Sequence, residues 1–192
     1  MAIEIERRFL IPNCSMALDG PATAESLRIR QGYFGRANGL RVRVRALLYA
    51  DGRRSGVLTL KGPRRGFCRQ EYEHLLPVEQ VERLIALLPP EQVVRKTRHF
   101  RAHNKLVWSI DCFEGANAGL VIAEVELVHS CQRVEVPSWV GEEITLNPRY
   151  GNSILARHPI GHFATARLGQ HIGLSASAEG AGPVGFVEAA AS

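Results

Sequence analysis

The sequence has little that would indicate a metal–thiolate site, a disulfide framework or a membrane anchor. The four cysteines have no short paired spacing; they are Cys14, Cys68, Cys112 and Cys131. We therefore expect reduced thiols in a cytoplasmic protein. No apolar run approaches the roughly 20 residues that a membrane helix needs, so we expect no membrane partner. Charges within the first four residues argue against a secretory signal.

Lysine is also scarce, although the chain is basic. Of 24 basic residues only Lys61, Lys96 and Lys105 are lysines, and the formal net charge is +5. A charge of this size permits an anionic partner without demanding nucleic acid. The arginines that a nucleic-acid surface would use are Arg28, Arg30, Arg53, Arg54, Arg64 and Arg65. Because aromatic residues do not interleave with them, we expect no nucleic-acid partner.

The dominant pattern along the chain is alternation of apolar and polar residues, which is typical of half-buried strands. Strands are predicted at 2–10, 27–34, 39–48, 56–61, 67–75, 95–102, 105–112 and 120–128. Apolar residues at helical spacing predict an amphipathic helix over 78–88, and a second helix is expected from Tyr150 to Arg157. This density of strands favours a mainly β fold, an antiparallel sheet closed or nearly closed on itself.

The length of 192 residues favours one domain, which we place at 1–160. The remaining segment, 161–192, is predicted to be a C-terminal extension. From about Gly173 onward it is mostly Ala, Gly and Ser, which cannot bury enough apolar area to offset the entropy of ordering. We expect that part to be disordered.

The first strand carries its charges on one face. Side chains two apart in a strand point the same way, so Glu4, Glu6 and Arg8 share a face. Ile5 and Phe9 lie on the other. Two carboxylates so spaced are able to hold a hard divalent cation, and the guanidinium one step further is able to hold phosphate.

Other predicted strands show the same segregation of charge. The residues that align are Arg41, Arg43 and Arg45; Thr59 and Lys61; Arg69, Glu71 and Glu73; Lys96 and Arg98; Asp111; and Glu124 and Glu126. Antiparallel strands often expose such faces to water. Three observations favour an inward orientation instead. Some of these strand faces are mainly acidic and others mainly basic, and two of the three lysines lie on them. The helix over 78–88 also needs an apolar strand face to pack against. Ile3 with Ile5, or Val42 with Val44, would supply that surface.

Charges that face inward would line a polar tunnel. Desolvated charges need partners, and a ligand with several negative charges, bound with a metal ion, would supply them. No His and Cys set competes as a metal site, because Pro159 interrupts the helix face that His158 and His162 would share.

Taken in order, these segments resemble the triphosphate tunnel metalloenzymes, or CYTH superfamily. Glu4-Ile5-Glu6-Arg7-Arg8 is similar to the ExExK signature of that family. The match continues through Arg30-Gln31-Gly32-Tyr33-Phe34, Leu40-Arg41-Val42-Arg43, Leu58-Thr59-Leu60-Lys61, Arg69-Gln70-Glu71-Tyr72-Glu73, Lys96-Thr97-Arg98, Asp111-Cys112-Phe113-Glu114-Gly115, Ala123-Glu124-Val125-Glu126-Leu127 and Arg149-Tyr150-Gly151-Asn152. It covers about residues 1–157 and looks closest to short bacterial inorganic tripolyphosphatases.

The resemblance implies an eight-stranded antiparallel tunnel barrel with a polar lumen and helices packed outside. It also implies a hydrolase that cleaves a linear triphosphate, most of all inorganic tripolyphosphate, to diphosphate and phosphate with Mg²⁺ or Mn²⁺. Glu4, Glu6 and Arg8 would form the catalytic centre. The implied metal ligands are Glu4, Glu6, Glu124 and Glu126. Phosphate would be held by Arg8, Arg41, Arg43, Lys61, Arg69, Lys96 and Arg98, with Glu71, Glu73 and Asp111 as supporting acids.

One residue departs from the signature, because Arg8 stands where the family has lysine. A flat guanidinium fork does not replace a compact ammonium without consequence. Two alternatives stay open. One is a class IV adenylate cyclase, because these enzymes share the tunnel and the signature; the other, favoured by Arg8, is a non-catalytic module that binds polyphosphate or nucleotide. Whether nucleoside or thiamine triphosphates are substrates stays open. Whether the chain forms a homodimer stays open as well.

Overall fold

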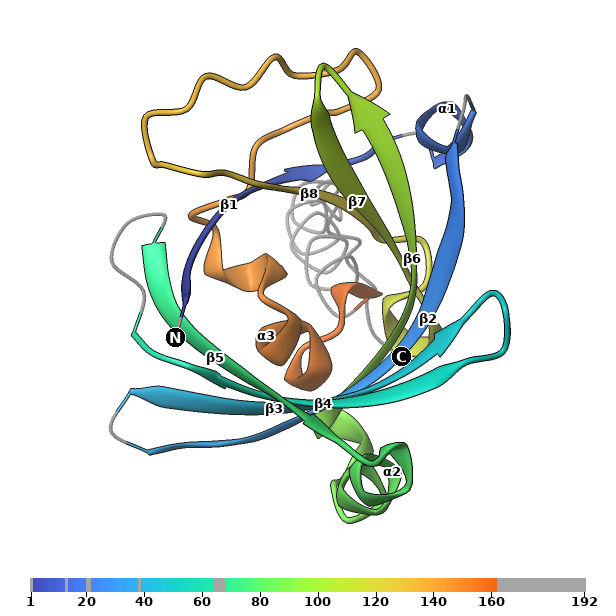
Figure 1. Ribbon diagram of the computed structural model, residues 1–192, viewed down its shortest axis with the longest axis vertical. Helices are drawn as coiled ribbons and strands as arrows, with labels where there is room; N and C mark the ends of the chain where they lie inside the picture. The colour runs from blue at the N-terminus through green and yellow to red at the C-terminus, as the bar shows by residue number, and fades with distance from the viewer. Residues whose placement is uncertain (1, 13, 20–21, 38, 64–67, 162–192) are drawn as a thin grey trace, which may run out of the picture. The chain divides into compact units, whose positions relative to one another are not determined.

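The computed structural model describes residues 2–12, 14–19, 22–37, 39–63 and 68–161. Within them, eight strands form a closed antiparallel barrel in the order β1-β5-β4-β3-β2-β6-β7-β8 (Figure 1). The strands are β1 (Ala2–Leu10), β2 (Ala22–Ala37), β3 (Leu40–Tyr49), β4 (Arg54–Lys61), β5 (Cys68–Leu76), β6 (Val93–His103), β7 (Leu106–Phe113) and β8 (Val121–Glu126). The predicted mainly β fold and closed barrel are confirmed. The domain boundary at 160 stays a prediction, and the expected tail disorder falls outside the described residues.

Short hairpins join most neighbouring strands. The β6–β7 turn places Asn104 and Lys105 at φ values of 45° and 65°, the left-handed conformation that a two-residue hairpin of this hand requires. Gly52, at φ 85°, makes the β3–β4 turn, where a side chain would be strained. These local turns set the registers that bring the charged residues of neighbouring strands side by side.

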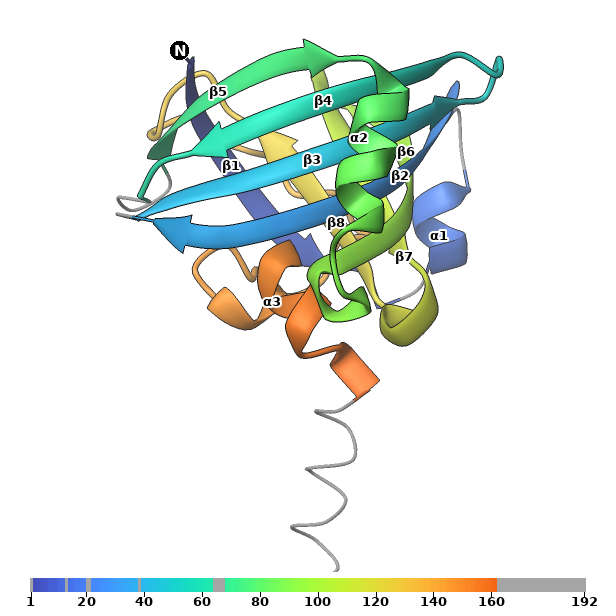
Figure 2. The ribbon, with the colours of Figure 1, turned by 90° about the horizontal axis from the view of Figure 1, so that it is seen from below.

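Helix α2 (Val78–Ala86) packs outside the barrel, as predicted, across β2, β3 and β4 (Figure 2). Val81 and Ile85 are fully buried and pack against Val44 of β3. Of the two surfaces expected to receive this helix, the structure therefore uses the face of Val44. Ile5 packs elsewhere, against the cluster around Trp108.

A second apolar layer covers the outer faces of β1, β7 and β8. Trp108 lies at its centre, with its ring centroid 5.6 Å from that of Phe9 and 5.7 Å from that of Trp139. Ala17, from the short helix α1 (Cys14–Leu18), is buried in the same cluster. No described helix is long and apolar enough to cross a membrane. The apolar outer faces of these strands are thus covered, while their charged faces look into the barrel.

The second predicted helix lies across one end of the barrel (Figures 1 and 2). It is divided into a 3-10 turn, η3 (Pro148–Tyr150), and α3 (Asn152–Arg157). Leu155 is fully buried among lumen-facing residues that include Phe113 and Ile122. Asn117 donates to the carbonyl of Leu155 at 2.9 Å and anchors the helix. The interior is therefore closed on this side by an apolar plug.

Candidate functional site

The barrel encloses a cavity of about 1100 Å³. Eight basic and six acidic side chains line it: Arg8, Arg41, Arg43, Arg45, Lys61, Arg69, Lys96, Arg98, Glu4, Glu6, Glu71, Glu73, Glu124 and Glu126. All the predicted site residues are in this set except Asp111, which is completely buried and contacts two of its members. The charged strand faces thus meet inside one enclosed space.

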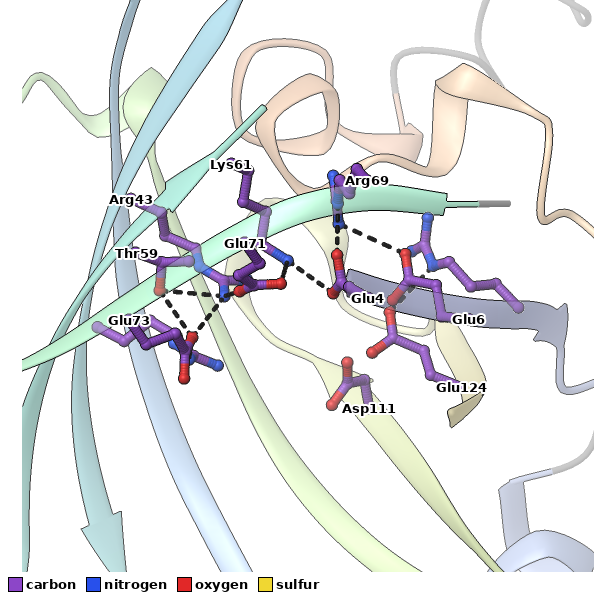
Figure 3. A network of polar contacts seen from close by, with 12 residues as sticks. Glu4, Glu6, Arg43, Thr59, Lys61, Arg69, Glu71, Glu73, Asp111 and Glu124 are labelled. Carbon is purple, nitrogen blue, oxygen red and sulfur yellow. Dashed lines mark hydrogen bonds and ion pairs between the residues drawn. The ribbon is translucent and has the colours of Figure 1, made fainter. Parts of the chain in front are cut away.

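Glu4 lies between two cations from neighbouring strands (Figure 3). Lys61 donates to it at 2.7 Å, and the Arg69 guanidinium forms a hydrogen-bonded ion pair with its other oxygen. Burial by itself raises the pKa of Glu4, but Lys61 and Arg69 outweigh it and hold that pKa well below its ordinary value. Lys61 also pairs with Glu71 at 2.9 Å. This part of the wall is therefore a chain of alternating charges.

A second network links β1, β6, β7 and β8. Arg98 makes two parallel bonds to Asp111, at 2.7 and 2.8 Å, and a third to Glu124 at 2.6 Å. Arg8 donates to the other oxygen of Glu124 at 3.0 Å. Lys96 is ion-paired with Asp111. The two parallel hydrogen bonds to Asp111 fix the orientation of the Arg98 guanidinium, which a single hydrogen bond would not do.

The pKa values of Lys96 and Glu124 in this network are both lowered, for different reasons. Burial lowers the pKa of Lys96 to about 8, with Asp111 opposing the change. Burial raises the pKa of Glu124, but Arg98 and Arg8 outweigh it, so that pKa lies well below the usual value. Near neutral pH we expect both groups to be charged, which a site for an ionic ligand requires.

A third group lies on β3, β4 and β5. Arg43 contacts Glu71 at 3.4 Å and Glu73 at 3.6 Å. Thr59 donates to Glu73 at 2.9 Å, and Arg45 is ion-paired with the same carboxylate. Burial, with Arg43 close by, lowers the pKa of Arg45 to about 10. The three arginines of β3 therefore do face inward, as the alternation predicted.

The carboxylates of β1 and β8 are crowded. Glu6 pairs across the strands with Glu126, and burial together with Glu4 and Glu6 raises the pKa of Glu126. Within the described ranges, however, no set of three or more His, Cys, Asp or Glu groups is gathered closely enough to hold a metal ion. Glu4 and Glu124 are instead bound by the basic side chains described above.

The plug and the residues just before it contribute polar groups at this end of the cavity. Arg8 donates to the Tyr150 carbonyl at 2.8 Å, and the Arg8 backbone N–H donates to the Thr145 hydroxyl at 3.0 Å. Arg41 donates to the Ser153 hydroxyl at 3.5 Å. Two predicted phosphate ligands are thus tied to the segment that closes the barrel.

Several lining residues have no assigned role from the sequence. Arg45 shares the alternation of Arg41 and Arg43, and this signal was enough to find it. Gln31 and Tyr33 lie within a segment that resembles the family, yet as uncharged residues they carry no sign of a site. The lining of the plug, from Thr145 to Ile154, has no strand periodicity from which its position could be predicted.

Comparisons with known proteins agree with this geometry. A family model described as the CYTH domain matches residues 2–153. The inorganic triphosphatase of Acetivibrio thermocellus is 35% identical over 165 residues, which are 85% of this chain and 99% of that protein. The inorganic triphosphatase of Nitrosomonas europaea is 34% identical over 162 residues, covering 80% and 96%. A crystal structure of the inorganic triphosphatase NE1496 matches with a TM-score of 0.57 at 30% identity, over 82% of this chain and 96% of that one.

Proposed function

The chain belongs to the CYTH domain family, and on that premise we propose that it is a metal-dependent triphosphatase that cleaves inorganic triphosphate to diphosphate and phosphate. The observation that carries the proposal is the enclosed cavity lined by eight basic and six acidic side chains. Phosphoryl transfer needs positioning and neutralisation of charge more than covalent chemistry, and this lining provides both.

Charge balance supports a role for a metal ion. The lining has an excess of two positive charges, whereas a linear triphosphate carries roughly four to five negative charges near neutral pH. A divalent cation makes up part of the difference. The crowding that raises the pKa of Glu126 marks a place where positive charge would be favourable.

Glu4, Glu6, Glu124 and Glu126 are the residues that we propose hold the metal. Carboxylate oxygens suit Mg²⁺ or Mn²⁺ better than Zn²⁺. When bound, such an ion withdraws charge from the phosphate oxygens. Because Glu4 and Glu124 are now paired with basic residues, we propose an exchange of partners, in which the basic side chains turn to phosphate and the carboxylates to the metal.

The residues of the chain would then divide the work of hydrolysis. Lys61, Arg69, Lys96 and Arg98, with Arg8, Arg41 and Arg43, would hold the phosphate oxygens and spread the developing charge. Glu4 or Glu6 would orient a water molecule toward the end phosphorus. As the new P–O bond forms, the P–O–P bond breaks and diphosphate leaves. Glu71, Glu73 and Asp111 keep the basic groups in position.

Phosphate release from a panel of triphosphates tests the proposed function directly. We expect the purified chain to release phosphate from tripolyphosphate with Mg²⁺ or Mn²⁺ and not in EDTA, and to act less well on ATP and thiamine triphosphate. Formation of cyclic AMP and diphosphate from ATP would identify a cyclase instead. Tight binding of tripolyphosphate without turnover in any metal would indicate a binding module. We include in this proposal that the ligand is a small polyanion and that neither nucleic acid nor a membrane is a partner. A cytoplasmic location and a homodimer stay predictions.

A further inference from the structure

Two uncharged residues of β2, Gln31 and Tyr33, have polar groups that the networks above leave unused. Gln31 is 1% exposed and Tyr33 is 8% exposed, and both line the cavity. Among the described residues, neither the nitrogen nor the oxygen of the Gln31 amide has a hydrogen-bond partner, and neither does the Tyr33 hydroxyl.

Buried polar groups without partners are unusual, because each costs the free energy of its lost hydration. The barrel could have avoided this cost with apolar side chains, as it does at the neighbouring lumen position, Ile29. Two such groups, two residues apart on one strand, therefore suggest a ligand that supplies the missing partners.

The surroundings of these groups indicate which kind of ligand fits. Across the β2–β3 ladder, Gln31 is opposite Arg45 and Tyr33 is opposite Arg43. The Nε atoms of both arginines are also buried without a partner in the described structure. Four N–H or O–H donors without a partner thus belong to side chains that line the same cavity, and two of these side chains carry a guanidinium charge. This arrangement suits the oxygens of an anion.

The protonation of Tyr33 is consistent with a donor role. Burial raises its pKa to about 12, although Arg43 lies near enough to oppose the change. The hydroxyl therefore keeps its proton throughout the neutral range. Arg43 is able only to donate to the hydroxyl oxygen, so the hydroxyl proton has no acceptor among the described residues.

The position of β2 in the barrel decides which part of a substrate would reach these donors. β1 and β2 are four strands apart in either direction around the closed sheet, so they are opposite walls of the lumen. Glu4, Glu6 and Arg8 lie on the β1 wall, and Gln31 and Tyr33 lie on the β2 wall. A phosphate chain held at the carboxylates would extend across the lumen toward β2.

We propose that Gln31 and Tyr33, together with Arg43 and Arg45, form a subsite for one unesterified end phosphate of the substrate. This inference rests on the proposed triphosphatase function and extends it to the substrate's free end. The amide N–H and the phenol O–H donate to phosphate oxygens. The Gln31 oxygen accepts from the hydroxyl that an end phosphate carries when it is singly protonated, a state populated near neutral pH. A phosphate esterified on that side has no such hydroxyl.

Binding in the absence of turnover tests the subsite independently of catalysis. Calorimetry with tripolyphosphate in EDTA would compare the full-length wild type with Gln31→Met and Tyr33→Phe, which keep shape and remove the polar groups. Hydrogen bonds to charged groups have substantial strength, so we expect Kd to rise about tenfold in each variant. Gln80→Met on the surface helix α2, and Tyr49→Phe outside the cavity lining, are the matched controls and should bind like the wild type.

Thermal unfolding of the ligand-free proteins separates binding from structure. Since no described protein hydrogen bond is lost, Tm should stay the same or rise in Gln31→Met and Tyr33→Phe. Kd values within twofold of the wild type for both variants would overturn the subsite, even if the wild type hydrolyses tripolyphosphate. So would a lower Tm with unchanged Kd, which would assign both residues to the fold. If both variants show the expected rise in Kd but the wild type releases no phosphate, the result would overturn the proposed hydrolysis and leave the subsite standing.

Discussion

Arg8 shows how a single side chain connects the site to the closure of the barrel. Its guanidinium donates to Glu124 at 3.0 Å and to the Tyr150 carbonyl at 2.8 Å, in a largely buried setting. The fork geometry allows both bonds at once. A lysine, the residue of the family signature at this position, has one nitrogen to serve two acceptors. The arginine therefore adds a link between the catalytic wall and the plug.

We expect Arg8→Lys to lower the free energy of unfolding by about 1–2 kcal/mol, because one buried acceptor loses its donor. Urea unfolding measures this change. Arg7→Lys is the matched control: Arg7 pairs with Glu143 at 2.9 Å, but the pair is partly exposed, so its replacement should cost less than about 1 kcal/mol. Equal losses in both variants would contradict the link.

Lys96 gives the site a predictable pH dependence. Burial lowers its pKa to about 8, so the ammonium is charged at neutral pH and loses its proton in mildly alkaline solution. An anion binds the charged form. Affinity for tripolyphosphate in EDTA should therefore fall severalfold between about pH 7 and about pH 9, as one favourable charge is lost.

Lys96→Arg separates this lysine from other titrating groups. Arginine stays charged over the whole range, so the variant should lose most of the alkaline decrease in affinity. Lys105→Arg, in the β6–β7 turn, should titrate like the wild type. A wild-type affinity that is constant across this range would show that Lys96 does not contact the ligand.

At the level of elements, helix α2 approaches the sheet closely at Gly56 of β4. A β-carbon there would lie 2.5 Å from the Leu76 carbonyl oxygen, 2.8 Å from Val81 Cγ2 and 3.1 Å from Val78 Cα. Two of these neighbours are backbone atoms, which have no alternative rotamer. Helix α2 therefore approaches the barrel as closely as it does only because residue 56 has no side chain.

Gly56→Ala should accordingly lower the free energy of unfolding by about 2–3 kcal/mol, as overpacked sites do. Gly35 in β2 is the control, because an added β-carbon meets nothing within 4 Å. Gly35→Ala should change stability by less than about 0.5 kcal/mol. Chemical unfolding of both variants measures the difference, and similar stabilities would contradict the close approach of α2.

The elements also show what the sequence could and could not predict. Alternation located all eight strands, because a strand with one polar and one apolar face shows a period of two. Strand β2 (Ala22–Ala37) begins earlier than the predicted 27–34, and its first part pairs irregularly with β6 before Ser26. The position of α3 across the barrel end depends on tertiary contacts such as Asn117 with Leu155, which no local pattern encodes.

Within the site, charge was the signal that sequence could use. The acidic and basic residues of the alternating faces were predicted to look inward, and they line the cavity. Gln31 and Tyr33 carry no charge, and the subsite that we propose for them rests on missing partners, which only a structure reveals. The existing pairing of Glu4 with Lys61 and Arg69 likewise follows from barrel closure, which brings β1 beside β5.

For the whole molecule, the proposed function depends on an enclosed cavity whose acidic and basic side chains pair with one another. Opposite charges satisfy one another around the cavity, while apolar clusters pack outside the barrel and the apolar plug closes one end. Such pairs are costly to bury and contribute little net stability, so their abundance is better explained by a ligand that replaces the partners. We therefore regard the exchange from internal ion pairs to phosphate and metal as the central property of this barrel.

The most direct test of that property is phosphate release from tripolyphosphate as Mg²⁺ is titrated, in the wild type, Glu6→Gln and the α2 surface control Glu79→Gln. Glu6 is a proposed metal ligand on the cavity wall, so its amide should reduce the rate at saturating Mg²⁺ by about 100-fold or more, with the fold kept, as judged by circular dichroism. Glu79→Gln should match the wild type. We expect metal-dependent release that requires Glu6. Equal activity of Glu6→Gln and the wild type, or release that persists in EDTA, would rule out the proposed exchange of partners.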